Sequence, residues 1–344
     1  MTKYLITGGA GFIGTNVADH YLGLGAEVII YDNFSRYGSE DNAEWLVKRY
    51  GPRVEVIRGD LRHPEASLAA AVERVDVVLH FAAQVAVTLS VTDPRHDFET
   101  NALGTFNLLE AVRLSTRRPA VLYSSTNKVY GKMAAVPIVE AGGRHCYADL
   151  AFGVGEEQPL EFYSPYGCSK GTGDQYVLDY ARIYGLQTVV FRQSCIYGPH
   201  QFGIEDQGWV AWFAIRSMQE QPFTIYGDGK QVRDVLYIDD LTAAYDAAIR
   251  HLATTSGQAY NIGGGPDSTL SLLELVDMLE QARGSRPSFG FADWRPGDQL
   301  VYISDIRKAY RDFGWKPRVA PREGLNRLMS WLSSHADLFA AKTR

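Results

Sequence analysis

The sequence predicts an α/β fold built on a doubly wound parallel sheet, with a smaller α/β domain interleaved at its C-terminal end. Three observations predict it. Short apolar runs alternate with longer amphipathic runs from residue 4 to residue 191, and strands that alternate with helices form parallel sheets. A glycine-rich turn follows the first apolar run. After Gly198 the pattern changes to Gly, Pro and aromatic residues with little regular period.

Six apolar runs predict buried strands. They are rich in Val, Ile, Leu and aromatic residues, and they lack the polar alternation of a sheet with one solvated face. Four longer stretches between them have a helical pattern. The predicted strands are residues 4–7, 28–31, 54–58, 75–81, 120–124 and 188–191, and the predicted helices are residues 13–24, 64–73, 97–114 and 164–184.

The C-terminal part of the chain predicts further elements. Residues 235–245 predict the start of a helix, and residues 259–262 predict a strand that returns to the main sheet. Helical patterns follow at residues 266–283 and 321–334. Gly/Pro-bearing turns separate these elements at residues 263–266 and 295–298.

The composition excludes several functions. The chain has 344 residues, a net charge of -6 and a pI of about 5.8, so we expect no general attraction to nucleic acid or to an anionic membrane. Cys146, Cys168 and Cys195 are scattered and show no metal-ligand spacing, which predicts reduced thiols and no metal site. The chain runs from Met1 into a strand without a signal-peptide pattern or a long apolar segment, so we expect a cytoplasmic location.

The first predicted strand leads into a dinucleotide-binding pattern, Gly8-Gly-Ala-Gly11-Phe-Ile-Gly14, which opens the first predicted helix. Gly8 permits a tight turn, Gly11 lets the backbone approach a pyrophosphate, and Gly14 lets helix and strand pack closely. The helix N-terminus offers free N–H groups and the positive end of its dipole to phosphates. The pattern therefore predicts a dinucleotide cofactor on a Rossmann-type sheet.

Asp32, at the end of the second strand, indicates which dinucleotide binds. Its carboxylate can accept hydrogen bonds from the adenosine ribose and would repel a 2′-phosphate, which favours NAD over NADP. Arg36 follows Asp32 closely in the sequence, and its positive charge leaves NADP as an alternative cofactor. Asp60 can reach the adenine or cap a helix, and His80 is predicted to be a packed core residue. The other residues predicted to contact the cofactor are Phe12, Ile13, Asn33, Ser35, Leu61, Phe81, Ala82, Ala83, Asn101 and Ser124.

We therefore predict two domains. Residues 1–192 would form an NAD-binding Rossmann domain, joined by residues 235–262. Residues 193–344 would form a substrate-binding domain. The ligand would lie in the crevice between them, at the carboxyl ends of the strands.

Tyr166 and Lys170 predict proton transfer on a hydroxyl group. They lie four residues apart, so their side chains share one face of a helix. A free tyrosine has a pKa near 10 and is only about 0.1% phenolate at pH 7. We expect Lys170 and a positively charged nicotinamide to lower the pKa of Tyr166, so that Tyr166 removes a proton while hydride passes to the nicotinamide. Thr126 would orient the same oxygen, and Lys170 would also hold the nicotinamide ribose.

Together these residues resemble the extended short-chain dehydrogenase/reductase family, which contains the nucleotide-sugar epimerases and dehydratases. The resemblance covers nearly the whole chain. It includes Asn101-Ala-Leu-Gly-Thr-Phe-Asn-Leu-Leu-Glu110 and Arg295-Pro-Gly-Asp298. It implies that Asn101 contacts the substrate side or braces the active-site strand, and that Arg295 binds the diphosphate of a sugar nucleotide.

The residues after Thr126 indicate the reaction. Dehydratases of the family carry an Asp-Glu pair there and decarboxylases usually carry a Glu, whereas this chain has Asn127-Lys128. Without an acid, elimination lacks its general acid and base, while epimerisation needs only a hydride that leaves and returns. Four segments closely resemble family members that epimerise CDP-linked 3,6-dideoxyhexoses at C2: residues 124–131, 164–171, 206–210 and 229–234.

This resemblance implies NAD-dependent inversion at C2 of a CDP-sugar through a transient 2-keto sugar, with the cofactor regenerated in each turnover. The spacing between Thr126 and Tyr166 is longer than in the 4-epimerases of the family, so residues 132–163 are predicted to form an added loop near the sugar. Lys128 can be a solvated loop lysine. The predicted substrate-binding residues are Gln84, Thr88, Ser125, Thr126, Asn127, Ser194 and Gln207, with Gln231, Arg233 and Arg295 assigned to the nucleotide.

Two other interpretations stay open. A UDP-hexose 4-epimerase, or another nucleotide-sugar epimerase, would share the tyrosine–lysine pair. A non-catalytic NAD-binding regulator is the alternative outside enzymes, and the intact set of Thr126, Tyr166 and Lys170 argues against it. The resemblance also implies a homodimer or homotetramer, in which the helices at residues 97–114 and 164–184 pair with their copies in a four-helix bundle.

Overall fold

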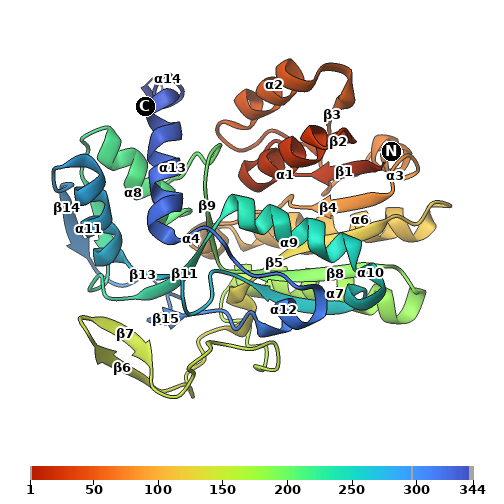
Figure 1. Ribbon diagram of the computed structural model, residues 1–344. Coiled ribbons are helices and arrows are strands. Elements are labelled where there is room, and N and C mark those ends of the chain that lie inside the picture. Colours follow the sequence, from red (N-terminus) through yellow and green to blue (C-terminus); the bar gives the residue numbers. More distant parts are fainter. Residues whose placement is uncertain (1, 296, 341–344) are drawn as a thin grey trace.

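A seven-stranded parallel sheet forms the centre of the molecule (Figure 1). The computed structural model describes residues 2–295 and 297–340. The six predicted strands are confirmed, and the strand predicted at residues 259–262 joins the same sheet at its edge. The strands are β1 Lys3–Thr7, β2 Glu27–Asp32, β3 Val54–Arg58, β4 Val77–His80, β5 Ala120–Thr126, β8 Thr188–Gln193 and β12 Gln258–Ile262.

The strand order predicts a crevice at the carboxyl ends of two central strands. The order is β12-β8-β5-β4-β1-β2-β3, so the chain builds outward from β1 in one direction as far as β3 and then returns to β4 on the other side. In such sheets the ligand site lies at the carboxyl ends of the strands where the order reverses. Here those strands are β1 and β4.

Helices cover both faces of the sheet, as the predicted doubly wound fold requires. One large apolar cluster packs the helices α1 Phe12–Gly23, α2 Ser39–Tyr50 and α9 Ile238–Arg250 on one face. A second cluster packs α3 Ala66–Val72, α6 Gly104–Leu114 and α7 Pro165–Tyr184 on the other face. The sequence pattern did not predict α2, whose buried residues are mostly small or polar: Ser39, Asn42, Ala43 and Leu46.

The predicted helix at residues 97–114 is interrupted. The short helices α4 Val87–Thr92 and α5 Pro94–Phe98 come first, and a π-helical turn, Glu99–Leu103, then leads into α6. Such turns are rare and occur frequently at functional sites. This one carries Asn101 into the protein interior.

The smaller C-terminal sheet holds β11 Val232–Tyr237 at its centre. The helix predicted at residue 235 begins at Ile238, because the preceding residues pair as a strand with β9 Cys195–Tyr197. A strand also precedes the next helix, which starts at Leu272 on a capping box made by Ser271 and Glu274. The remaining elements here are α8 Trp209–Met218, β10 Phe223–Tyr226, α10 Leu252–Thr255, β13 Thr269–Ser271, α11 Leu272–Arg283, β14 Phe289–Ala292, β15 Val301–Tyr302, α12 Arg307–Phe313, α13 Pro321–Ser334 and α14 Asp337–Ala340.

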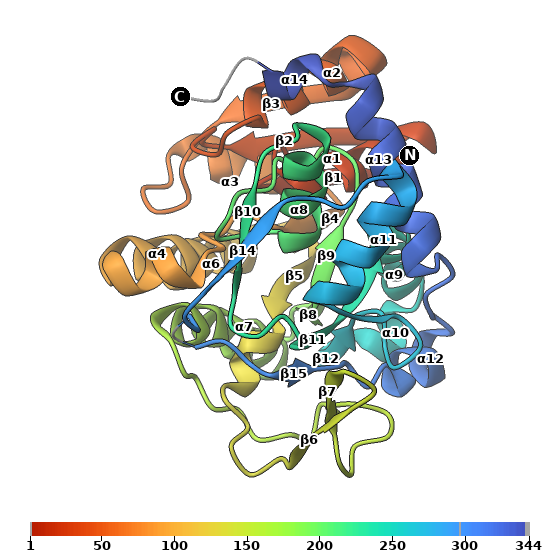
Figure 2. The ribbon, with the colours of Figure 1, turned by 90° about the vertical axis from the view of Figure 1, so that its left-hand side faces the viewer.

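The added segment at residues 132–163 contains an antiparallel hairpin, β6 Ile138–Ala141 and β7 Arg144–Tyr147. Figure 2 shows it below the small sheet, next to β15. Backbone N–H of His145 donates to Lys230 O at 3.0 Å, and the guanidinium of Arg144 pairs with Glu274 at 3.1 Å. The hairpin in this segment is therefore held against the C-terminal part of the chain, and its proximity to the sugar stays a prediction.

Among the described helices, none is long and apolar enough to cross a membrane.

Candidate active site

A cavity of about 340 Å³ lies at the carboxyl ends of the central strands, between the main sheet and the smaller sheet. Its wall begins at the glycine turn after β1 and passes Asp32 at the end of β2. It continues to Ser124 on β5 and Tyr166 on α7, and it reaches Trp209 at the start of α8.

The three glycines of the turn differ in what surrounds them. A Cβ on Gly8, which has a φ of +67°, would lie 2.5 Å from the backbone N of Ala82. A Cβ on Gly14 would lie 2.3 Å from Gly8 O. A Cβ on Gly11 would meet only Gly8 O, at 3.2 Å, and Gly11 lines the cavity. Gly8 and Gly14 are thus required by the fold, whereas Gly11 leaves room in the cavity for a close ligand such as a pyrophosphate.

The carboxylate of Asp32 is fixed by backbone donors. Its oxygens accept hydrogen bonds from Ala10 N at 3.0 Å and from Phe34 N at 2.8 Å. Burial raises the pKa of Asp32, and the two hydrogen bonds partly offset this effect. Nearby, the guanidinium of Arg36 donates to Gln207 Oε1 at 2.6 Å, and burial lowers the pKa of Arg36.

Asp60 does not cap a helix. The residue before α3 is Glu65, and Asp60 instead forms an ion pair with Arg62 at 2.7 Å and accepts from Asn33 Nδ2 at 3.1 Å. The hydrogen bonds from Arg62 hold the pKa of Asp60 well below its usual range.

Nearly all residues predicted to contact the cofactor line this one cavity. They are Gly8, Gly11, Phe12, Ile13, Asp32, Asn33, Ser35, Arg36, Asp60, Leu61, Phe81, Ala82, Ala83, Ser124, Tyr166 and Lys170.

Asn101 is the exception, since it is buried behind the cavity wall. Its Oδ1 accepts from Gln84 N at 2.9 Å, and its Nδ2 donates to Ser169 Oγ at 3.1 Å. Of the two roles predicted for Asn101, these contacts fit a brace between the segment after β4 and the helix α7.

Thr126, Tyr166 and Lys170 come together at the cavity wall. Thr126 ends β5, and the other two lie in the first turns of α7. That helix begins where Ser164 Oγ accepts from Gly167 N at 3.0 Å, with Pro165 at its first position. Its close approach to β5 depends on Gly173, because a Cβ there would lie 2.4 Å from Tyr123 Oη.

The predicted lowering of the Tyr166 pKa depends on the positive charge of a bound nicotinamide, so it stays a prediction. Burial raises the pKa of Tyr166 to about 12, a hydrogen bond with Thr126 partly offsets this, and the charge of Asp97 adds to the rise. Burial also lowers the pKa of Lys170 to about 7. Among the protein's own groups, desolvation therefore has the largest effect on the pKa of Tyr166.

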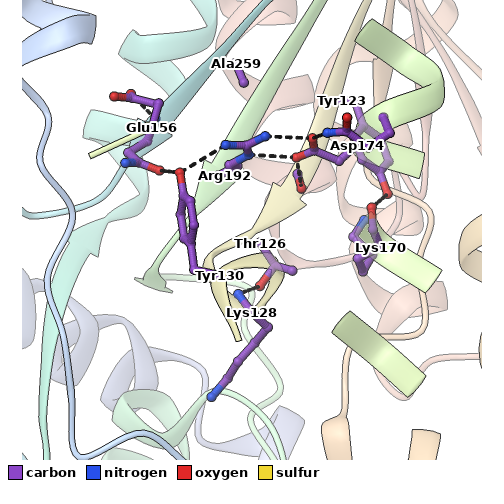
Figure 3. Close-up of polar contacts among 12 residues, drawn as sticks. Tyr123, Thr126, Lys128, Tyr130, Glu156, Lys170, Asp174, Arg192 and Ala259 are labelled. Atoms are coloured by element: carbon purple, nitrogen blue, oxygen red, sulfur yellow. Dashed lines mark hydrogen bonds and ion pairs between the residues drawn. The ribbon is translucent and has the colours of Figure 1, made fainter. Parts of the chain in front are cut away.

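No carboxylate in the described part of the chain forms an ion pair with Lys170. Its Nζ donates to Ser124 O at 2.5 Å and lies 4.3 Å from the centre of the Tyr123 ring. One turn further along α7, Asp174 forms two hydrogen bonds with Arg192 of β8, each at 3.0 Å, and accepts from Ser125 Oγ at 2.7 Å (Figure 3). This buried ion pair ties α7 to both β5 and β8.

The predicted substrate residues divide into two groups. Ser125, Thr126, Ser194 and Gln207 line the cavity. The remaining ones do not line it: Gln84, Thr88, Asn127, Gln231, Arg233 and Arg295.

Residues of this second group that were assigned to the nucleotide have partners within the protein. Arg233 pairs with Asp298 at 2.6 Å. Arg295 pairs with Asp206 at 2.9 Å, and its guanidinium lies 3.7 Å from the centre of the Tyr226 ring. The amide of Gln231 donates to Tyr226 O at 2.6 Å. Arg295 and Gln231 thus share a contact with Tyr226.

Lys128 is not a solvated loop lysine. Its ammonium lies 3.4 Å from Gly297 O and 3.3 Å from Gln299 Oε1, and it points away from Lys170 in Figure 3. Burial and the charge of Arg233 lower the pKa of Lys128 to about 8. The lysine therefore links the end of β5 to the segment that carries Asp298.

Two buried acids near this site were missed by the sequence analysis. Asp174 lies four residues after Lys170, and Asp97 lies four residues before Asn101, so helical spacing was a usable signal for both. Their partners were not predictable, because Arg192 and Gln84 come from distant strands and loops.

Comparisons with known proteins agree with this geometry. The sequence matches the NAD dependent epimerase/dehydratase family over residues 4–263. The chain belongs to that family. It is 43% identical to the CDP-paratose 2-epimerase of Salmonella typhi over 96% of this chain and 99% of that one. It is 32% identical to a putative UDP-glucose 4-epimerase of Methanocaldococcus jannaschii, over 96% and 98% of the two chains.

Solved structures show the same fold with the cofactor in place. The UDP-glucuronic acid 4-epimerase from Bacillus cereus, in complex with UDP-glucuronic acid and NAD, superposes with a TM-score of 0.83 at 28% identity, over 96% of this chain and 99% of that one. The dTDP-glucose 4,6-dehydratase DesIV from Streptomyces venezuelae, with NAD bound, also gives 0.83, at 29% identity over 97% and 98% of the chains. The predicted family, the predicted NAD-dependent epimerase class of enzyme and the predicted cofactor, NAD, are therefore confirmed.

The glycine geometry of this epimerase-family enzyme gives a prediction. Gly11→Ala is expected to retain the fold but to reduce the NAD content, because Gly11 lines the cavity and a Cβ there meets only Gly8 O, at 3.2 Å. Gly14→Ala is expected to lower the free energy of unfolding by about 1–3 kcal/mol, because its methyl group overlaps the Gly8 backbone. Gly290→Ala is the control, since a Cβ there meets nothing within 4 Å.

Urea denaturation measures stability, and absorbance after denaturation measures NAD per chain. Equal loss of stability in Gly11→Ala and Gly14→Ala, or an undiminished NAD content in Gly11→Ala, would contradict this assignment.

Proposed function

We propose that this enzyme inverts C2 of a CDP-linked 3,6-dideoxyhexose and converts CDP-paratose to CDP-tyvelose. The observation that carries the proposal is that Thr126, Tyr166 and Lys170 meet at one cavity wall. In the sequence, Thr126 is followed directly by Asn127-Lys128 and not by an acid. The 43% identity with the CDP-paratose 2-epimerase of Salmonella typhi supports the choice of carbon and of nucleotide.

NAD, when bound, supplies a hydride acceptor and a positive charge next to the hydroxyl-bearing carbon. Tyr166 Oη removes the proton of the C2 hydroxyl, and Thr126 Oγ1 holds the same oxygen by a hydrogen bond. Lys170 stabilises the phenolate through its charge. After the resulting 2-keto sugar has turned, C2 would take the hydride back on its other face, which inverts that carbon, and Tyr166 would return the proton to the oxygen.

The acid groups of the cavity lie beside β2 and β3, away from Thr126, where water loss would need them. Within residues 2–295 and 297–340, the carboxylates that line the cavity are Asp32 and Asp60, which follow β2 and β3. Beside Thr126, Asn127 Oδ1 accepts from the threonine hydroxyl at 3.4 Å, and Lys128 offers an ammonium. This supports epimerisation over dehydration, because elimination needs an acid at the sugar.

We propose that the lining residues of the main sheet hold NAD and that the cations of the smaller domain hold the substrate diphosphate. Asp32 would accept from the adenosine ribose, and Gly11 would face the pyrophosphate. Arg233 and Arg295 have the planar donor geometry that suits phosphate oxygens.

A UDP-hexose 4-epimerase is the second candidate, because the relative from Methanocaldococcus jannaschii bears that description. It would use the same tyrosine and lysine on a different carbon. The cytoplasmic location stays a prediction.

Incubation with a panel of CDP- and UDP-sugars tests the proposal, with NMR identifying the carbon that inverts. Inversion at C2 of CDP-paratose or CDP-tyvelose is expected. Tyr166→Phe serves as the control and is expected to retain NAD while losing about 100-fold or more in turnover. Inversion at C4 of a UDP-hexose, with no reaction on CDP-sugars, would overturn the assignment.

We also propose that the enzyme is a homodimer paired through α6 and α7, with a tetramer as the alternative. Large apolar side chains are exposed on this side of the molecule, and exposed apolar patches mark protein interfaces. Phe106 and Tyr176 touch across the two helices, with ring centres 5.9 Å apart. The large apolar residues of helices α4 to α7 that are exposed are Leu89, Val91, Phe98, Phe106, Leu114, Tyr176, Ile183 and Tyr184.

Phe106→Arg combined with Tyr176→Arg is expected to convert the dimer to a monomer, because it buries two charges in the paired face. Size-exclusion chromatography with light scattering measures the mass. Leu24→Arg, at an exposed position after α1, is the control and should stay dimeric. A double variant with unchanged mass would place the interface elsewhere.

A further inference from the structure

A hydrogen bond between Arg36 and Gln207 joins two parts of the cavity wall. Arg36 Nη2 donates to Gln207 Oε1 at 2.6 Å, and the two residues lie 171 positions apart in the sequence. Arg36 follows Asp32 and the strand β2, whereas Gln207 directly precedes the turn into α8. Both residues line the cavity. The bond therefore connects the wall beside Asp32 with the wall that leads to the C-terminal part of the chain.

Gln207 is the last residue of a tight turn. Ile204 N donates to Gln207 O at 3.1 Å, and Gln207 N donates to Ile204 O at 3.0 Å. Arg295 holds the tip of this turn, since its guanidinium donates to Glu205 O at 3.0 Å and pairs with Asp206 at 2.9 Å. The turn is therefore fixed from the side that is proposed to bind the substrate diphosphate.

The residues before the turn are attached to the cofactor-binding part of the chain. The side chains of His200 and Asn42 share a hydrogen bond at 2.9 Å. Phe202 packs directly on the segment after β2, because a Cβ on Gly38 would lie 2.2 Å from its ring. These contacts fix the start of the segment, and the hydrogen bond to Gln207 fixes its end.

The guanidinium of Arg36 is not taken by an acid. No carboxylate in the described part of the chain forms an ion pair with it, whereas Arg295 pairs with Asp206. Arg36 and Gln207 are both half-buried, so water competes only in part for their hydrogen bond. A charged donor also makes that bond stronger than one between neutral groups.

We propose that the hydrogen bond from Arg36 to Gln207 is a latch, which closes the adenosine end of the cavity and keeps NAD bound through each turnover. Gln207 is thus a positioning residue that acts through Arg36. The proposal deepens the proposed function and rests on it for the placement of the adenosine beside Asp32. A cofactor that accepts a hydride and returns it must stay in the site between the two steps, and the latch opposes its release there.

Exchange of bound NAD for ¹⁴C-labelled NAD in the purified holoenzyme tests the latch without any sugar. Gln207→Leu removes the acceptor and is expected to release NAD about 10-fold faster or more, because a hydrogen bond to a charged group is lost. Gln207→Glu keeps an acceptor and should retain slow release. Gln221→Leu replaces an exposed glutamine after α8 and is the control that should leave the rate unchanged.

A double-mutant cycle separates the latch from a direct contact between Arg36 and NAD. Arg36→Met combined with Gln207→Leu should release NAD no faster than the faster of the two single variants. Additive acceleration, an unchanged rate in Gln207→Leu, or equal rates in Gln207→Leu and Gln207→Glu would each overturn the proposal. If Gln207→Leu does not fold, Gln207→Asn replaces it in the same comparison, because its shorter side chain withdraws the acceptor.

Turnover gives a second readout. In Gln207→Leu, activity should decay during the assay as NADH leaves the enzyme, and added NAD should restore it. Decay equal to that of the unmodified enzyme would contradict the latch. Faster NAD release from Gln207→Leu in a protein that epimerises no sugar would support the latch and contradict the proposed function. An unchanged NAD affinity in Asp32→Asn would contradict the proposed placement of the adenosine, and with it the end of the cavity assigned to the latch.

Discussion

The buried ion pair between Asp174 and Arg192 fixes the active site, because it sets the position of α7 against the central sheet. Both side chains are nearly inaccessible to solvent. Breaking such a pair costs about 3–5 kcal/mol, since one charge is left buried without a partner. The Ser125 hydroxyl joins the pair from β5, so one cluster aligns the strand that carries Thr126 with the helix that carries Tyr166 and Lys170.

Much of the fold was predictable because local patterns and topology rules agree. Buried parallel strands are continuous apolar runs, and the turn from Gly8 to Gly14 marks the first crossover. The helix α2 was missed, because it buries Asn42 and Ser39 rather than a regular apolar stripe. The hairpin at residues 132–163 was also missed, because β6 is mostly exposed, β7 is half-buried, and the two are held by contacts to the distant residues Lys230 and Glu274.

The candidate site was predictable where spacing alone defines it. Tyr166 and Lys170 share a helix face, and Thr126 ends a strand, so their meeting follows from the fold. The charge balance was not predictable. Lys128 belongs to a buried group with Arg233, and Tyr166 has a raised pKa, because both effects depend on desolvation by residues far away in the sequence.

We propose that hydride leaves C2 of the sugar and returns to the same carbon within one site. Substrate carrying deuterium at C2 tests it most directly. The account predicts that the epimerised product retains the deuterium at C2 and that no label enters the solvent, because NAD holds the hydride between the two steps. Loss of the label to water would indicate a carbanion at C2 and would contradict the account.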